Sequence, residues 1–254
     1  MTVLELYQAL DRRIPPSLSC EWDNDGLAVC PDESAPVRGV LCVLDVTHAA
    51  VDKAVAEGCN VIISHHPLLF HPLRALSAAT PVSVLARRCL LGGISVICLH
   101  TRADAVEGGV NDCLIRALGL VPQGEAEEGQ MFRLGRLPVP MSADDFAAYA
   151  AQKLSVGAMR YSAAEGRAVS LVGVCGGSGR DFLPRALALE CDAYLSGELG
   201  HHTLTDAPAQ GISVFECGHY ETELPVLPFF AAFVRSLDDA VKVITADITP
   251  ICTR

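Results

Sequence analysis

Several histidines and carboxylates of this sequence directly follow apolar, β-rich runs, where folding could gather them around a metal ion. The runs are "NVIISHH" (60–66), "ISVICLHTRAD" (94–104) and "ISVFECGHYETE" (212–223). The residues at their ends are His65, His66, His100, Asp104, His219 and Glu223. Imidazoles and carboxylates bind divalent transition metals, and three histidines with two carboxylates are enough for two ions that share a carboxylate. The set therefore predicts a metal site.

Each of these residues also has an ordinary structural interpretation. A histidine at a strand end is more often hydrogen-bonded than metal-bound, and Asp104 could cap a helix. Glu223 could lie in a first helical turn, where the helix dipole favours a carboxylate. The spacing His219-x-x-x-Glu223 places both side chains on one helix face if the segment is helical, although Pro225 suggests that a helix only begins there. Only their joint position favours a metal.

The surrounding pattern predicts an α/β fold. Near-continuous apolar runs alternate with helical stretches in two series, which a polar stretch at 122–130 separates. The expected strands are 39–46, 60–64, 94–100, 168–175, 193–197, 212–218 and 241–247, and the expected helices are 49–58, 81–93 and 183–190. This alternation is typical of parallel sheets covered by helices on both faces. Ligands bind at the carboxyl ends of such strands, which is where the histidines and carboxylates fall.

The two series resemble each other. "KAVAEGCNVIISHH" (53–66) aligns with "RALALECDAYLSGE" (185–198), and "GISV" occurs at 93–96 and again at 211–214, each time shortly before a histidine. We interpret the matches as an internal duplication. The expected domains are residues 1–125 and 126–254, and the C-terminal part of the second could pack back on the first.

The alignment also identifies polar residues in the second copy. "GELGHH" (197–202) lies where the first copy has its His-His pair. Glu198, His201 and His202 are therefore candidates for the wall of the site. Glu198 and His201, together with His100, are the candidates for a catalytic acid or base.

Composition excludes several classes of protein. With 50% apolar and 19% charged residues, the chain predicts a folded core, and its net charge of −11 argues against binding of a nucleic acid by bulk charge. No uncharged apolar stretch is long enough to span a membrane, and the N-terminal segment shows helical spacing without a basic leader. We expect no membrane contact and a cytoplasmic location.

The remaining motifs carry weaker signals. The eleven cysteines include no Cys-x-x-Cys pair, so we interpret most of them as buried thiols that fill the core. The glycine-rich turn at 175–179 could bind a phosphate through its backbone amides, or it could only form a tight turn. Trp22, Asp23 and Asn24 are assigned to structure, with Asn24 and Asp25 as candidate turn formers.

Five motifs in order resemble one known family. They are "WDNDGL" (22–27), "ISHHPLLF" (63–70), "HTRADAVEGGVND" (100–112), "CGGSG" (175–179) and "GHYETE" (218–223). They are similar to the motifs of the Nif-like dinuclear-metal hexameric proteins, also known as GTP cyclohydrolase 1 type 2 homologues, and cover nearly the whole chain. The resemblance implies two intertwined α/β domains and a homohexameric toroid whose metal sites face an internal cavity.

The resemblance also implies a ligand set for two divalent ions, for which Zn, Fe, Mn, Co and Ni are all suitable. The implied ligands are His65, His66, Asp104, His219 and Glu223, with Glu223 bridging. The chain departs from the family in "HTRADA", where relatives usually carry Asn-Leu before the aspartate and this chain has Arg102-Ala103. Arg102 could contact an anionic substrate or point into solvent.

Two functions agree with such a site. In a metal-dependent hydrolase, two ions would lower the pKa of a shared water for attack on carbon or phosphorus. Its substrate would be a small molecule, and the family name suggests a purine nucleotide, as in GTP cyclohydrolase chemistry, or a phosphoester. In a metal-binding or metal-delivery protein, the same ligands would hold exchangeable ions without turnover. A purely structural protein would leave five potential ligands unexplained.

Overall fold

The computed structural model describes residues 1–124 and 130–251 as an α/β protein of two compact units. The first unit comprises Met1–Val106 and Leu227–Pro250, and the second comprises Glu107–Val226. The predicted α/β class is confirmed. The first unit is discontinuous in sequence, because the chain leaves it after Val106 and returns to it at Leu227.

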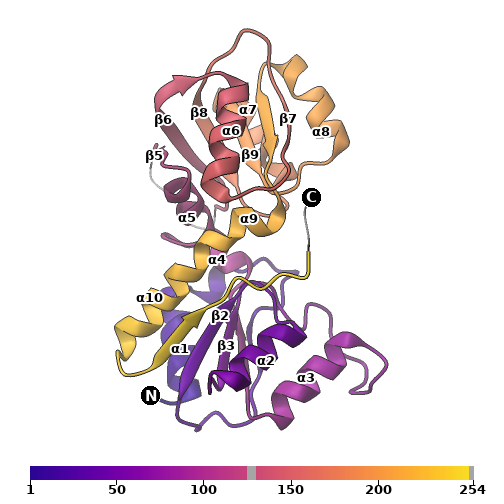
Figure 1. Cartoon of the computed structure of the whole chain (residues 1–254), viewed down its shortest axis with the longest axis vertical. Coiled ribbons are helices and arrows are strands. Elements are labelled where there is room, and N and C mark those ends of the chain that lie inside the picture. The colour runs from indigo at the N-terminus through magenta and orange to yellow at the C-terminus, as the bar shows by residue number, and fades with distance from the viewer. Residues whose placement is uncertain (125–129, 252–254) are drawn as a thin grey trace. The chain divides into compact units, whose positions relative to one another are not determined.

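A five-stranded sheet forms the centre of the first unit, with the strand order β1-β4-β3-β2-β11. Its strands are β1 (Gly26–Val29), β2 (Gly39–Val43), β3 (Val61–Ser64), β4 (Ser95–Cys98) and β11 (Lys242–Thr245). All neighbours are parallel except β1 and β4. Its helices are α1 (Val3–Arg13), α2 (His48–Ala56), α3 (Pro81–Leu91), α4 (Thr101–Ala105) and α10 (Leu227–Leu237), with the 3-10 turn η1 (Pro16–Leu18). In Figure 1, α2 and α3 lie on one side of this sheet and α1 and α10 on the other.

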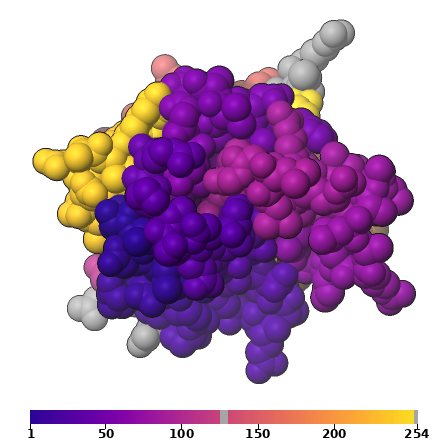
Figure 2. Space-filling view, turned by 90° about the horizontal axis from the view of Figure 1, so that it is seen from below, coloured from indigo at the N-terminus to yellow at the C-terminus, as the bar shows by residue number. Residues whose placement is uncertain are grey.

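The N-terminal segment and the segment Leu227–Pro250 contact each other within the first unit. The Arg13 guanidinium lies 5.1 Å from the centre of the Phe229 ring, and the N-terminal ammonium lies 3.6 Å from Asp238. In Figure 2 the yellow C-terminal segment accordingly lies beside the indigo N-terminal residues. The strand β11, expected at 241–247, pairs in parallel with β2 and so belongs to the first sheet.

A six-stranded sheet forms the centre of the second unit, with the order β5-β6-β8-β9-β10-β7. Its strands are β5 (Val121–Pro122), β6 (Arg133–Met141), β7 (Arg160–Ser162), β8 (Val169–Cys175), β9 (Ala193–Ser196) and β10 (Ser213–Glu216). Its helices are α5 (Val110–Ala117), α6 (Ala143–Leu154), α7 (Leu183–Ala188), α8 (His201–Asp206) and α9 (His219–Glu223), with 3-10 turns η2 (Arg180–Phe182), η3 (Pro208–Gln210) and η4 (Leu224–Val226). The pairs β8-β9 and β9-β10 are parallel, and the outer strands are antiparallel.

Alternating side chains bury both faces of this second sheet. Phe215 and Leu195 pack with residues of α5 and α6, whereas their neighbours Val214 and Tyr194 pack with residues of α7 and α8. Successive strand residues point to opposite faces, so two apolar faces require nearly continuous apolar strands. This is why the sequence pattern identified β8, β9 and β10.

The two sheets repeat one topology, in agreement with the duplication read from the sequence. The order β1-β4-β3-β2 in the first sheet matches β7-β10-β9-β8 in the second, with the same parallel core and the same antiparallel edge strand. The strands β4 and β10 both begin at the serine of "GISV".

Two smaller predictions have clear outcomes. The ten cysteines in the described residues are all free thiols, and eight of them are buried, as expected. Asn24 and Asp25 do not form the turn before β1, because the turn falls at Glu21 and Trp22 and is closed by a hydrogen bond from Asp23 N–H to Cys20 O.

None of the helices in the described residues is both long and apolar enough to cross a membrane.

Candidate metal centre

The first unit gathers three imidazoles at the carboxyl ends of its parallel strands. His65 and His66 follow β3, and His100 follows β4. Their ring centres lie 4.9 Å (His65 to His66), 5.3 Å (His65 to His100) and 5.7 Å (His66 to His100) apart. One nitrogen from each ring lies within 4.8 Å of the others, which is close enough for the three to share one ion.

Each of these imidazoles is oriented by a hydrogen bond at Nδ1. His65 Nδ1 lies 2.9 Å from Leu99 O, His66 Nδ1 lies 2.9 Å from Asp45 Oδ1, and His100 Nδ1 lies 2.8 Å from Asp23 Oδ1. A carbonyl or carboxylate oxygen can only accept, so Nδ1 carries the proton and the ring presents the lone pair of Nε2. This is the arrangement in which proteins prepare histidines to bind metals.

Backbone pairing continues past the strand ends and fixes the histidine segment. The amides of His65 and His66 donate to Val43 O and Leu44 O, at 3.2 and 2.9 Å, and Leu99 N–H donates to Ser64 O at 2.9 Å. Both histidines are therefore held at the edge where β2, β3 and β4 end. The hydrogen-bond pattern of the sheet thus extends to the residues that carry the imidazoles.

A carboxylate adds to this group from the next helix. Asp104 lies in α4, which begins directly after His100, and its Oδ1 lies 3.6 Å from His65 Nε2. His65 is fully buried and Asp104 is largely buried. The structure thus brings together four of the residues that the sequence singled out.

Both sequence interpretations of Arg102 are wrong. Its guanidinium is 0% exposed and lies 2.6 Å from Asp11 Oδ1 and 3.1 Å from Asp25 Oδ2. It also donates to Ile14 O at 3.1 Å. The Arg102 guanidinium therefore neither points into solvent nor is accessible to an anionic substrate. It ties α4, which carries Asp104, to α1 and to the segment before β1.

The second unit supplies an imidazole and a carboxylate on one helix. His219 begins α9 and Glu223 ends it, and His219 Nε2 lies 3.2 Å from Glu223 Oε1. The predicted shared face is confirmed, while Pro225 lies in the 3-10 turn that follows. Glu223 is buried and His219 is partly exposed.

The glycine-rich turn after β8 is not a phosphate cradle. Its amides already have protein acceptors, since Gly176 N–H donates to Asn111 at 2.7 Å, Gly177 N–H to Thr222 at 3.0 Å and Gly179 N–H to Ser196 at 3.0 Å. Gly177 has a φ of +59°, and a Cβ there would lie 2.2 Å from Glu223 Oε1. The glycine instead leaves room for the carboxylate.

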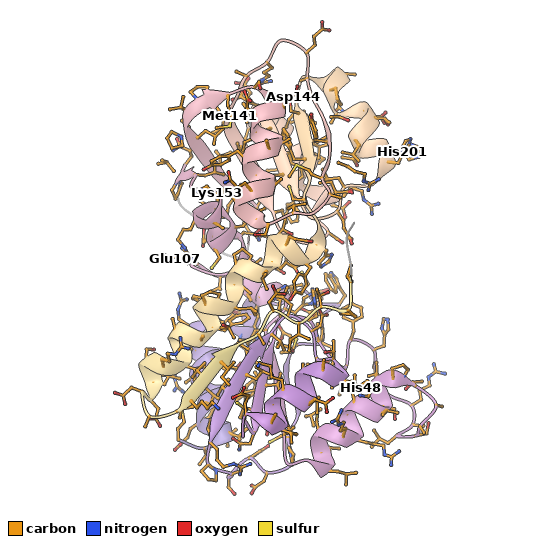
Figure 3. The ribbon with its side chains drawn as sticks, viewed as in Figure 1. His48, Glu107, Met141, Asp144, Lys153 and His201 are labelled. Atoms are coloured by element: carbon orange, nitrogen blue, oxygen red, sulfur yellow. The ribbon has the colours of Figure 1, made fainter. Side chains whose placement is uncertain are left out.

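Glu198 lies beside His219, as the duplication suggested. Its Oε1 is 3.5 Å from His219 Nδ1, and its Oε2 accepts from Ser178 Oγ at 2.6 Å. His201 and His202, in contrast, are exposed on α8, with ring centres 5.6 Å apart. Figure 3 shows His201 at the right-hand edge of the second unit. Glu198 is thus the better placed of these candidates.

Sequence reasoning missed two carboxylates that orient the histidines. Asp23 was assigned only to structure, yet it accepts from His100 and from the backbone and hydroxyl of Thr101. Burial raises the pKa of Asp23, but these hydrogen bonds outweigh it and hold the pKa well below its ordinary value. Asp45 was not singled out, although it follows β2, the strand parallel to β3. The geometry also assigns His100 to the ligand group rather than to acid–base catalysis alone.

The donors of each unit, taken by itself, are of the kind that binds a divalent transition metal through nitrogen and oxygen. Cys217, the thiol nearest the ligands in sequence, is fully buried, and burial raises its pKa well above the ordinary value. A thiol that holds its proton is a poor ligand. Imidazoles and carboxylates therefore remain as the donors.

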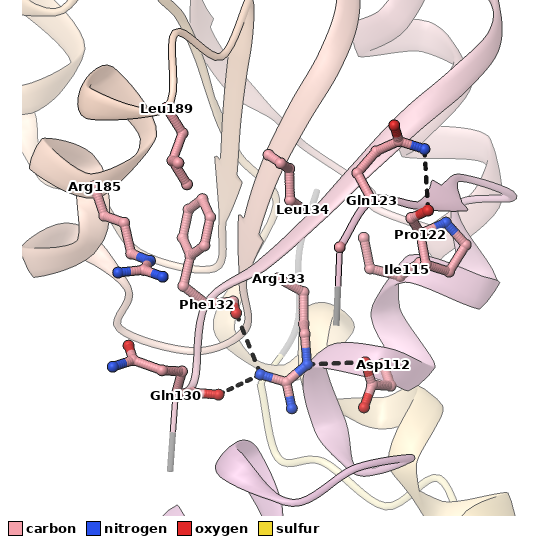
Figure 4. A pocket seen from close by; sticks show the side chains of 11 residues that line it. Asp112, Ile115, Pro122, Gln123, Gln130, Phe132, Arg133, Leu134, Arg185 and Leu189 are labelled. Atoms are coloured by element: carbon pink, nitrogen blue, oxygen red, sulfur yellow. Dashed lines mark hydrogen bonds and ion pairs between the residues drawn. The ribbon is translucent and has the colours of Figure 1, made fainter. Parts of the chain in front are cut away.

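A cavity of about 230 Å³ in the second unit has a different lining (Figure 4). The Arg133 guanidinium inside it donates to Asp112 Oδ1 at 2.9 Å and to the carbonyls of Phe132 and Gln130. Arg185 lies 5.8 Å from the centre of the Phe132 ring. None of the predicted ligands is among the described residues that line it.

Comparison with known proteins gives concordant matches. The family model Duf34/NIF3 (NGG1p interacting factor 3) matches residues 1–250. A GTP cyclohydrolase 1 type 2 homolog of Streptomyces coelicolor is 30% identical over 92% of this chain and 86% of its own length. The protein NIF3 homolog of Schizosaccharomyces pombe is 30% identical over 86% of this chain and 84% of its own. A hypothetical protein of Staphylococcus aureus with 24% identity superposes with a TM-score of 0.91, over 100% of this chain and 99% of the other.

Proposed function

The chain belongs to the Duf34/NIF3 family, and on that premise we propose that it is a divalent-metal-dependent hydrolase of a small molecule. The proposal includes two ions per chain. Several relatives are called GTP cyclohydrolase 1 type 2 homologs, which favours a nucleotide or another phosphoester as the substrate.

One observation carries the metal assignment. All three imidazoles of the first unit have Nδ1 engaged by a carbonyl or carboxylate oxygen, and all three rings meet at one sheet edge. The two features together are what a shared metal ion requires of its imidazole ligands. Carboxylate and carbonyl partners of this kind orient metal-binding histidines and raise their basicity.

The proposed ligands come from both units. From the first unit we assign His65, His66 and Asp104, and from the second His219 and Glu223, as the family resemblance implies. Glu223 is the proposed bridging ligand, since a buried carboxylate with two oxygens can serve two ions. His100 is a further candidate ligand in the first group.

A bound divalent ion would supply a Lewis acid that polarises water and neutralises developing negative charge. The protein's own part is to position groups and move protons. Glu198, exposed and in contact with His219 and Ser178, is the proposed proton acceptor. Asp23 keeps the His100 ring in one orientation, so that its Nε2 faces the other two imidazoles.

A metal-delivery function is the alternative. It is favoured by the partial exposure of His66 and His219, through which a chelator or acceptor could reach an ion. A delivery protein needs exchangeable ligands but no acid or base. The two functions therefore differ in turnover rather than in the ligand set.

A paired test of metal dependence and turnover separates these functions. Protein purified without chelator would be screened on nucleotides and phosphoesters before chelation, after it, and after the metal is returned. A hydrolase loses and regains activity, and His66→Ala lowers turnover at saturating metal, whereas His48→Ala, on the exposed start of α2, does not. Release of the ions to a competing chelator without any metal-dependent turnover in the whole screen would leave only the delivery function.

A further inference from the structure

An exposed aromatic group lies beside the histidines of the first unit. The Trp22 ring centre lies 6.1 Å from that of Phe70 and 6.2 Å from that of His100, and Phe70 and His100 are 6.3 Å apart. All three pairs are edge-to-face, with interplanar angles of 61°, 75° and 83°. We call Trp22, Phe70 and His100 the aromatic corner.

The backbone under this corner is fixed although its rings are exposed. Asp23, directly after Trp22, has a fully buried side chain that accepts from His100 and Thr101. The Asn24 side-chain amide donates to Leu69 O, which ties the tryptophan segment to the residue before Phe70. Trp22 and Phe70 are therefore presented by two segments that hydrogen bonds hold together.

Exposure of these rings has no structural explanation within the unit. Trp22 is 62% exposed and Phe70 is 40% exposed, and large aromatic side chains are usually mostly buried. An exposed apolar group on a fixed backbone is typical of a binding surface, because ordering it on binding costs little further entropy. The two rings offer flat faces at the rim of the histidine group.

We propose that the aromatic corner binds a planar, nitrogen-containing ring of the substrate by stacking. This inference rests on the proposed function and names the substrate class for that same site. Aromatic side chains are stacking platforms for nucleobase-like rings, because every such ring has a π-face that can lie against theirs. His100 belongs to both groups, with its ring centre 5.3 Å from His65 and 5.7 Å from His66. A ring stacked on Trp22 would thus hold its polar substituents near the imidazoles.

The chain provides its own reporter, because Trp22 is its only tryptophan. Metal-loaded protein would be titrated with guanosine 5′-monophosphate, with guanosine, which lacks the phosphate, and with ribose 5-phosphate, which lacks the ring. The expected result is quenching of tryptophan fluorescence by both ring compounds but not by ribose 5-phosphate. No quenching by either ring compound, together with no binding of them in calorimetry, would overturn the proposal.

Variants separate stacking from binding of phosphate by the metal. Trp22→Ala should weaken binding of guanosine and of guanosine 5′-monophosphate about tenfold in calorimetry, and Trp22→Phe should restore most of it, as stacking on an aromatic face predicts. Binding of ribose 5-phosphate should not change. Leu91→Ala, at a side chain that is 85% exposed on α3, is the control for loss of exposed apolar surface. Equal affinity of Trp22→Ala and the wild type for guanosine would contradict the proposal.

The result of these binding experiments does not depend on whether the protein turns over a substrate. If metal-dependent hydrolysis is absent but guanosine binds through Trp22, the hydrolase proposal fails and the ring site stands. If the wild type and Trp22→Ala hydrolyse a phosphoester without a ring equally well, and guanosine does not bind, the hydrolase proposal stands and the ring site fails.

Discussion

At the scale of single residues, the proposed metal binding depends on the partners of the histidines. In the sequence, Asp45 is marked only by its position after β2, and Asp23 only by its position before β1. Yet each of them orients an imidazole through Nδ1. The gathering of the candidate ligands could be predicted because histidine and carboxylate are rare at strand ends in such a combination. Their partners could not, because a carboxylate is common everywhere on a protein surface.

Removing the partner of His66 tests this dependence. Asp45→Asn should weaken binding of a divalent ion about tenfold to a hundredfold, because a neutral amide no longer raises the basicity of the ring as the carboxylate does. Competition with a fluorescent chelator measures the affinity. Asp52→Asn, at an exposed carboxylate on α2, is the matched control. Unchanged affinity in Asp45→Asn would show that this hydrogen bond does not prepare a ligand.

The buried ion pair of Arg102 makes a second prediction at this scale. Arg102→Met should lower the free energy of unfolding by about 3 kcal/mol, since Asp25 would remain buried without its guanidinium partner. Urea unfolding measures the change, and Arg87→Met, at an exposed arginine of α3, should be nearly neutral. An Arg102→Met protein as stable as the wild type would contradict the structural role assigned here. Sequence alone misplaced this residue because its partner Asp11 lies 91 positions away.

At the scale of elements, strands buried on both faces were predictable and half-exposed ones were not. The strands β2, β3, β9 and β10 read as continuous apolar runs because helices cover both of their faces. The strand β6 contains Arg136, Pro138 and Pro140, and its second half is mostly exposed, so it carries no such run. Its place beside β8 follows from tertiary pairing.

The turn after β8 allows an element-scale prediction with a close control. Gly177→Ala should displace Glu223, because the new Cβ would lie 2.2 Å from its Oε1, and should therefore reduce the bound metal. Gly166→Ala has a similar positive φ, +69° against +59°, but nothing within 4 Å of its Cβ. Both variants carry the backbone strain of a left-handed residue, and only the first should lose metal in elemental analysis. Equal metal content in the two would exclude the steric role of Gly177.

At the scale of the whole molecule, the chain is a duplicated α/β fold whose two sheets share one topology. The duplication was visible in the sequence because "GISV" begins both β4 and β10. Each sheet brings its polar residues to the carboxyl ends of its parallel strands, with two histidines after β3 and Glu198 after β9.

Assembly is the prediction that belongs to this scale. The family resemblance implies a homohexamer, so light scattering at micromolar concentration should report about six times the 26.9 kDa chain mass. The measurement should be made with and without divalent metal, since the hexamer is expected in both. A monomer in both would remove the basis for an enclosed cavity lined by metal sites.

The central claim is that this chain holds two divalent ions through histidines and carboxylates, and elemental analysis at saturating metal tests it most directly. We predict two ions per chain in the wild type, with a larger loss in Glu223→Ala than in any single histidine variant, because a bridging carboxylate serves both ions. His48→Ala should retain both ions. A wild-type protein that never exceeds one ion per chain, or that loses no more metal in Glu223→Ala than in His48→Ala, would contradict the dinuclear centre.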